Sequence, residues 1–149
     1  MIAKKTKYGL HALIHLSQHY SKGPVLIADL AKKENIPKKF LEVILWELKK
    51  HGLLESKQGK GGGYSLAKHP REIKLGQVIR ILEGPLAPVS CVSQTAYKKC
   101  KECRDENYCG IRLVMKDVRE AISNILDKTS LEEVVLKTVK KDLNFNYQI

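Results

Sequence analysis

Hydrophobic residues recur at helical spacing near the start of the chain. Leu10, Leu13 and Ile14 belong to one stripe within residues 8–20, and the sequence Lys22-Gly23-Pro24 ends it. The pattern predicts a first helix over residues 8–20, with one apolar side turned to a core.

Two further helices are predicted before residue 52. Ile27–Glu34 has the pattern of a short helix, and Asn35 suits a left-handed stop. Pro37 fits the first turn of the next helix, where its missing N–H costs nothing, and Gly52 ends that helix. The helix that begins at Pro37 carries apolar residues at the spacing i, i+3, i+4 and i+7, namely Leu41, Ile44, Leu45 and Leu48. A short helix, a tight turn and a longer basic helix together predict a helix-turn-helix.

A β-hairpin is predicted directly after this unit. Leu53–Lys57 and Tyr64–Ala67 have strand patterns, and Val25-Leu26 has the pattern of a brief strand. The tip, Gln58–Gly63, holds four glycines, which permit positive φ and a close approach to another backbone. A strand pattern after Gly63 argues against a nucleotide-phosphate loop, which would be followed by a helix. The predicted fold is therefore mainly α with a small β-hairpin, a winged helix-turn-helix.

A long helix is predicted in the second half, after a short one over Leu75–Glu83 and an irregular loop over residues 87–108. It spans Cys109–Asp127, and its apolar residues alternate four and three apart: Ile111, Met115, Val118, Ile122 and Ile125. This heptad seam favours a dimerisation helix, because so small a chain offers few partners of that length. Ordinary packing against its own domain is the alternative.

The chain accordingly divides into four parts. Residues 1–84 are expected to form a winged-helix DNA-binding domain and residues 85–108 a cysteine-rich loop. Residues 109–142 are expected to hold the dimerisation helix and a C-terminal helix. That last helix opens on a capping box of Ser130 and Glu133 and is predicted to end near Val139. Residues 143–149 are expected to be a frayed or accessory tail.

Positive charge is concentrated in the first half. The chain has 149 residues and a net charge of +11, and residues 1–75 hold 15 basic and 6 acidic side chains. Such an imbalance points to a polyanionic partner such as double-stranded DNA. No stretch approaches the roughly 20 apolar residues of a membrane-spanning helix, and we expect a cytoplasmic protein with no membrane partner.

Ten residues are candidates for contacting DNA. The start of a recognition helix points into the major groove, and a wing follows phosphates or the minor groove. The candidates lie in the first helix, the recognition helix and the wing: Lys5, Lys7, Lys38, Lys39, Phe40, Glu42, Lys49, Lys57, Gln58 and Lys60. Phe40 and Trp46 are nevertheless expected to pack within the protein rather than to stack on bases.

The four cysteines lie within one stretch, at Cys91, Cys100, Cys103 and Cys109. Clustered thiols in a cytosolic chain bind metal or serve redox chemistry more often than they form disulfides. The spacing alone leaves zinc, an iron–sulfur cluster, free thiols and a disulfide pair open. The neighbouring residues Lys98, Lys99, Lys101 and Arg104 are expected to lower the pKa of the thiols.

Several segments, in this order, resemble the IscR-type winged-helix transcription regulators. They are Lys7-Tyr8-Gly9-Leu10, Ile36–Leu48, Gly61-Gly62-Gly63-Tyr64, Leu75–Ile79, Glu83–Pro88, Cys91 and the stretch from Cys109 to Leu131. The resemblance implies a homodimeric transcription regulator, not an enzyme, that binds a palindromic operator and senses iron–sulfur or redox status. It also implies a base-reading role for Glu42, and Gln58 stands where some relatives carry a minor-groove arginine.

The resemblance implies an iron–sulfur cluster held by Cys91, Cys103 and Cys109. The chain departs from the family pattern, because Arg112 replaces the histidine ligand of some members and Cys100 is an additional cysteine. Cys100 is therefore the expected fourth ligand. We expect a two-iron (2Fe-2S) cluster in preference to a four-iron (4Fe-4S) one, with zinc as the alternative.

Two competing functions remain at this point. One is a cluster-independent or zinc-stabilised repressor, and the other is a thiol redox protein that uses Cys100 and Cys103, although no thioredoxin-like βαβ pattern surrounds them.

His11, His15 and His19 share a helix face at a spacing that can bind metal, but a polar or half-buried face is the commoner outcome.

Overall fold

The computed structural model describes residues 2–147 and places three helices and a hairpin in one unit. The helices are α1 (Lys4–Gln18), α2 (Ile27–Lys33) and α3 (Lys38–Lys50), and the strands are β1 (Leu54–Lys57) and β2 (Gly63–Leu66). The strands pair antiparallel, with Leu54 opposite Leu66 and Lys57 opposite Gly63. The chain is thus mainly helical with one small hairpin, a winged helix-turn-helix, as its sequence predicts.

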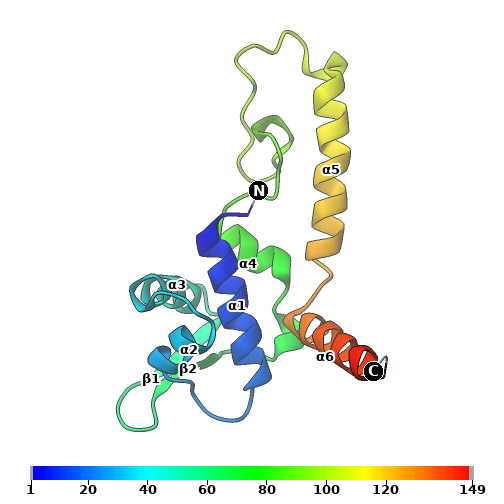
Figure 1. Cartoon of the computed structure of the whole chain (residues 1–149). Coiled ribbons are helices and arrows are strands. Elements are labelled where there is room, and N and C mark those ends of the chain that lie inside the picture. Colours follow the sequence, from blue (N-terminus) through cyan, green and yellow to red (C-terminus); the bar gives the residue numbers. More distant parts are fainter. Residues whose placement is uncertain (1, 148–149) are drawn as a thin grey trace.

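The remaining elements continue from this unit (Figure 1). They are η1 (Pro70–Glu72), α4 (Leu75–Leu82), η2 (Ser90–Val92), η3 (Glu106–Tyr108), α5 (Gly110–Leu126) and α6 (Leu131–Tyr147). Figure 1 shows α5 extending away from the body formed by α1 to α4, with the irregular chain between α4 and α5 running beside it. Within residues 2–147, no helix combines the length and the apolar character needed to cross a bilayer.

The predicted stops are found in the backbone. Asn35 has a φ of 53° after α2, and Gly52 has a φ of 76° after α3. The N–H of Leu53 donates to the carbonyl of Leu48 at 3.0 Å, which closes the end of α3. These left-handed residues fix the turn into α3 and the turn from α3 into the hairpin.

The core lies between α1, α2, α3 and α4. Leu13, Leu30, Leu41 and Leu45 are fully buried there. Leu131, the first residue of α6, belongs to the same cluster. Its N–H donates to the carbonyl of Ile73 at 3.0 Å, so the start of α6 is fastened to the chain just before α4.

Three boundaries differ from the sequence prediction by two residues or more. The first helix begins at Lys4 rather than near residue 8 and ends at Gln18 rather than at residue 20. The last helix continues to Tyr147 instead of ending near Val139. It continues because residues 140–146 contain no glycine or proline to stop it. Residues 148–149 of the expected tail lie outside the described residues.

Candidate nucleic-acid interface and cysteine loop

The recognition helix α3 turns one side to the core and the other to solvent. The four residues of its predicted apolar stripe, Leu41, Ile44, Leu45 and Leu48, are buried. The predicted DNA candidates on this helix are all exposed, namely Lys38, Lys39, Phe40, Glu42 and Lys49. The helix-turn-helix therefore presents these side chains to solvent.

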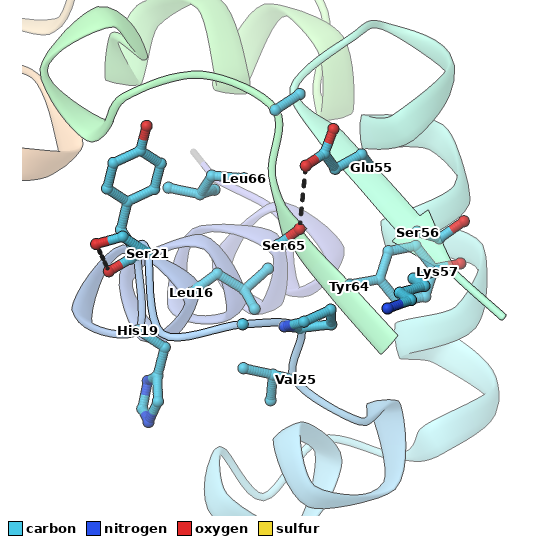
Figure 2. Close-up of a pocket in the computed structure, with 14 residues that line it drawn as sticks. Leu16, His19, Ser21, Val25, Glu55, Ser56, Lys57, Tyr64, Ser65 and Leu66 are labelled. Atoms are coloured by element: carbon cyan, nitrogen blue, oxygen red, sulfur yellow. Dashed lines mark hydrogen bonds between the residues drawn. The ribbon is translucent and has the colours of Figure 1, made fainter. Parts of the chain in front are cut away.

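The wing is attached to the segment between α1 and α2. Val25 and Tyr64 exchange two backbone hydrogen bonds of 2.8 Å each, an isolated bridge where the sequence predicts a brief strand. Figure 2 shows the pocket at this junction, where Leu16, Val25 and Leu66 line one part and Glu55 and Ser65 another. The bridge positions the exposed tip that carries Lys57, Gln58 and Lys60.

Glycine is required where β2 begins. Gly63 has a φ of 141°, and a Cβ at this position would lie 2.2 Å from the carbonyl oxygen of Val25. Gly59 and Gly61 also have positive φ, in the turn itself. The predicted close approach of two backbones is thus found at Gly63.

Two of the candidate lysines already have protein partners. Lys5 Nζ lies 2.5 Å from Glu47 Oε2, an ion pair that links α1 to α3. Lys49 Nζ donates to Ser56 Oγ at 2.6 Å, which links α3 to β1. The other five lysines of the candidate set are exposed, namely Lys7, Lys38, Lys39, Lys57 and Lys60. These two contacts orient α3 relative to its neighbours and leave the remaining cations facing solvent.

The histidines of α1 form a packed polar face. His15 is buried, and its Nδ1 lies 2.8 Å from Glu34 Oε1 at the end of α2. His19 stacks on His15 with ring centroids 4.5 Å apart, and His11 is exposed. The contacts of this face connect α1 with α2, as expected for a polar, half-buried surface.

The cysteine loop connects α4 to α5. Cys91 lies in η2, and Cys109 immediately precedes α5. All four cysteines are free; Cys100 is exposed, and the other three are partly exposed. Among residues 2–147, no three His, Cys, Asp or Glu side chains lie close enough together to hold a metal ion. In this conformation the four thiols therefore do not fit a cluster or a zinc ion.

The expected effect of the lysines on Cys100 is wrong. Cys100 Sγ donates a hydrogen bond to Glu102 Oε2 at 3.0 Å. This hydrogen bond raises the pKa of the Cys100 thiol above its usual value. An acid two residues away outweighs the lysines because it faces the sulfur directly. A reactive thiol needs a lowered pKa, so the geometry disfavours Cys100 as a redox nucleophile.

The apolar seam of α5 is uncovered in the single chain. No residue of α5 is buried. Ile111 is 70% exposed and Ile125 is 67% exposed, and Val118 is exposed as well. Met115 and Ile122 are partly exposed. On another side of the helix, Arg119 Nη1 donates to the carbonyl oxygen of η2 residue 92 at 2.7 Å, so α5 is tied to η2.

Comparison with known proteins identifies the family. A family model described as an iron-dependent transcriptional regulator, Rrf2, matches residues 2–137. The chain belongs to the Rrf2 family. It is therefore a DNA-binding transcription regulator and not an enzyme, in agreement with the sequence prediction.

Individual relatives of this Rrf2 regulator cover nearly its whole length. It is 32% identical to the HTH-type transcriptional regulator CymR of Bacillus subtilis over 92% of the chain and 91% of that protein. It is 38% identical to an rrf2-like HTH-type regulator of Rhodobacter capsulatus, over 91% of the chain and 92% of the relative.

Solved structures share the fold. The structure of CymR, described as the global cysteine regulator of B. subtilis, superimposes with a TM-score of 0.77 at 31% identity, covering 92% of this chain and 97% of that one. The structure of T. potens IscR gives a TM-score of 0.74 at 30% identity, covering 93% and 88%.

Sequence reasoning missed two polar links in this Rrf2 regulator. Glu83 accepts hydrogen bonds from the hydroxyl of Thr6 at 2.6 Å and from the N–H of Ala3 at 2.9 Å. Arg80 donates to both carboxylate oxygens of Asp127, at 2.5 and 2.9 Å. Each link joins segments far apart in the sequence, so no local spacing indicates it.

The expectation that Phe40 and Trp46 pack within the protein is wrong. Phe40 is 60% exposed and Trp46 is 59% exposed. Both lie on α3 outside its buried stripe, which is already filled by aliphatic side chains. The exposed side of the recognition helix therefore carries aromatic as well as basic residues.

Proposed function

We propose that this Rrf2 regulator acts as a homodimer that binds a palindromic operator through α3 and the wing. The single observation that supports this most is the separation of two surfaces on one chain. Exposed lysines lie on α3 and the wing, and the uncovered apolar seam lies on α5. Figure 1 shows α5 extending away from α3 and the hairpin. An obligate dimer surface is apolar, and a DNA surface is basic.

In this proposal the parts of the chain have separate tasks. Residues 1–84 bind DNA, the loop of residues 85–108 receives the signal, and residues 109–142 pair the two copies. Residues 143–149 have no task in this scheme. The five seam residues, Ile111, Met115, Val118, Ile122 and Ile125, would be covered by α5 of the second copy. Two copies related by a twofold axis would then meet two half-sites of the operator.

The salt dependence of DNA binding tests the DNA surface. Lys5 and Lys49 have protein partners, which leaves five candidate lysines per protomer and so about ten phosphate contacts per dimer. The logarithm of the binding constant should then fall with the logarithm of the salt concentration with a slope of about −9. Lys39→Ala should make the slope less steep, whereas Lys140→Ala on α6 should leave it unchanged. A flat salt response contradicts the proposed surface.

The oligomeric state tests the seam of α5. Sedimentation should give a dimer for the wild-type chain and a monomer for Val118→Glu, which places a charge in the proposed interface. Asp117→Asn, on the neighbouring residue, is the matched control and should remain a dimer. A wild-type chain that sediments as a monomer at all concentrations contradicts the pairing.

We further propose that the thiols of Cys91, Cys100, Cys103 and Cys109 receive an iron–sulfur or redox signal, with a two-iron cluster as the favoured ligand. The four cysteines supply the sulfur donors that such a cluster needs. The amino end of the 17-residue helix α5 lies at Cys109, and the positive end of a helix suits an anionic centre. The loop would have to rearrange to bring the sulfurs together, and regulation requires that operator DNA binds the two loop states with different affinity.

A cluster-independent regulator is the second candidate. Two observations favour it. The cysteines within residues 2–147 are dispersed, and the chain is similar to CymR, one structure of which is described as the oxidised form of the Staphylococcus aureus protein. Anaerobic purification separates the two candidates. Visible absorption with stoichiometric iron and sulfide supports the cluster, and a colourless protein with one zinc ion, or with neither metal, supports the second candidate.

Variants of the loop test the ligand set. Cys103→Ser should abolish the visible absorption if its sulfur holds the cluster. Thr95→Ala is the matched control, because it changes the same loop without removing a sulfur donor. Retention of the full absorption by Cys103→Ser contradicts the proposed ligand set.

A further inference from the structure

An apolar patch lies on the exposed side of the recognition helix. Val43 and Trp46 are each 59% exposed. At about 100° per residue, both project from α3 on the side opposite the buried stripe, together with Lys39 and Lys50. Phe40 lies at the edge of this side. Exposing a tryptophan and a valine on one helix face costs solvation free energy that a partner would recover.

The charges around the patch select the kind of partner. Lys50 Nζ lies 5.3 Å from the centre of the Trp46 ring, and Lys38 and Lys39 are exposed on the same helix. An apolar protein groove would have to desolvate these ammonium groups, whereas a nucleic acid pairs them with phosphates. Charge complementarity therefore assigns the patch to DNA.

The major groove offers one apolar group on the base edges, the C5 methyl of thymine. Val43 has a stiff, branched side chain, and Trp46 presents a broad apolar surface. Three residues along a helix rise about 4.5 Å, close to the rise of about 3.4 Å between base pairs. The two side chains are thus spaced to contact methyl groups on neighbouring base pairs.

We infer that Val43 and Trp46 read thymine methyl groups in each operator half-site, beside the base contacted by Glu42. This inference rests on the proposed binding of α3 in the major groove. It predicts adjacent thymines in the half-site, next to a cytosine whose amino group donates to Glu42.

Replacement of thymine by deoxyuridine tests the inference, because it removes only the methyl group. A duplex is first selected from a random pool with the wild-type chain, and each thymine of the selected half-site is then replaced in turn. At one or two neighbouring positions the affinity should fall on the order of fourfold, the value of one buried methyl group. The Val43→Ala variant should bind the thymine and uracil duplexes equally at the position that Val43 contacts. The Trp46→Ala variant should do the same at the position that Trp46 contacts.

Phe145→Ala provides a matched control, because Phe145 is 68% exposed on α6, far along the chain from α3. This variant should keep the full preference for thymine. Equal binding of all thymine and uracil duplexes by the wild-type chain overturns the inference, as does a Trp46→Ala variant that still prefers thymine. If Trp46→Ala changes the oligomeric state instead, the patch pairs protein copies and the inference is wrong. Failure to enrich any sequence overturns the proposed operator binding as well, so the two failures are distinguishable.

Discussion

Substitution of Gly63 by alanine should detach the wing from the helix-turn-helix. The added Cβ would lie 2.2 Å from the carbonyl oxygen of Val25 and 2.9 Å from the N–H nitrogen of Leu26. Both are backbone atoms, so the overlap is relieved only if the start of β2 moves away from Val25. That movement breaks the two 2.8 Å hydrogen bonds between Val25 and Tyr64.

The expected loss can be worked out from these contacts. Two backbone hydrogen bonds contribute about 2 kcal/mol together. The φ of 141° adds about 1–3 kcal/mol of strain for alanine. The free energy of unfolding should therefore fall by about 3–5 kcal/mol, a large share of the total for a small protein.

Gly61 provides the matched control in the same turn. It has a φ of 75°, and a Cβ there would meet nothing within 4 Å. Gly61→Ala should cost only the left-handed strain, about 1–2 kcal/mol. Urea unfolding of both variants at one protein concentration, followed by circular dichroism, measures the difference. Equal midpoints for the two variants would refute the role assigned to the backbone contact at Val25.

Three more predictions concern the packing of the helices. Gly9→Ala places a Cβ 2.3 Å from Leu82 Cδ1 and should lower the free energy of unfolding, measured in urea, by about 1–3 kcal/mol. The double mutant with Leu82→Ala should lose less stability than the sum of the two single mutants. Losses that simply add contradict the contact. Glu83 has a lowered pKa, chiefly because the Thr6 hydroxyl donates to it. The contribution of Glu83 to the free energy of unfolding is present above the pKa of the unfolded state and is lost as the pH falls through the pKa of the folded state. Glu83→Gln should therefore flatten the decline of stability below about pH 4.5. A decline in acid that is the same for both chains contradicts this. Ser130→Ala removes the cap of α6 and should lower stability by about 1 kcal/mol, and an unchanged thermal midpoint speaks against the cap.

The helix-turn-helix and the hairpin could be predicted because their determinants are local. The stripe of α3 ends at Gly52, whose positive φ the structure confirms. The capping box of α6 is also formed: Ser130 N donates to Glu133 Oε2 at 2.6 Å, and Glu133 N donates to Ser130 Oγ at 3.2 Å. In each case the residues that decide the conformation are within a few positions of one another.

Contacts between distant residues could not be predicted in this way. Thr6 is fully buried although it stands among lysines, because its hydroxyl reaches Glu83. This contact anchors the first turns of α1, which begin earlier than the apolar stripe indicates. At Cys100 the decisive contact is local, because Glu102 is two residues away, no farther than Lys98. Sequence distance alone does not show which of these charges faces the sulfur, and the carboxylate that does so raises the pKa of the thiol.

Helix α5 has the geometry of a lever. Its 17 residues span about 25 Å, and its carboxyl end is pinned by the Arg80–Asp127 pair. A swing of about 10° about that pivot moves the opposite tip, where Cys109 stands, by about 4 Å. In the proposed dimer, in which α5 of one copy packs on α5 of the other, such a swing would change the separation of the two recognition helices. Because successive base pairs rise by about 3.4 Å, a displacement as large as that at the tip would take the two helices out of register with their half-sites.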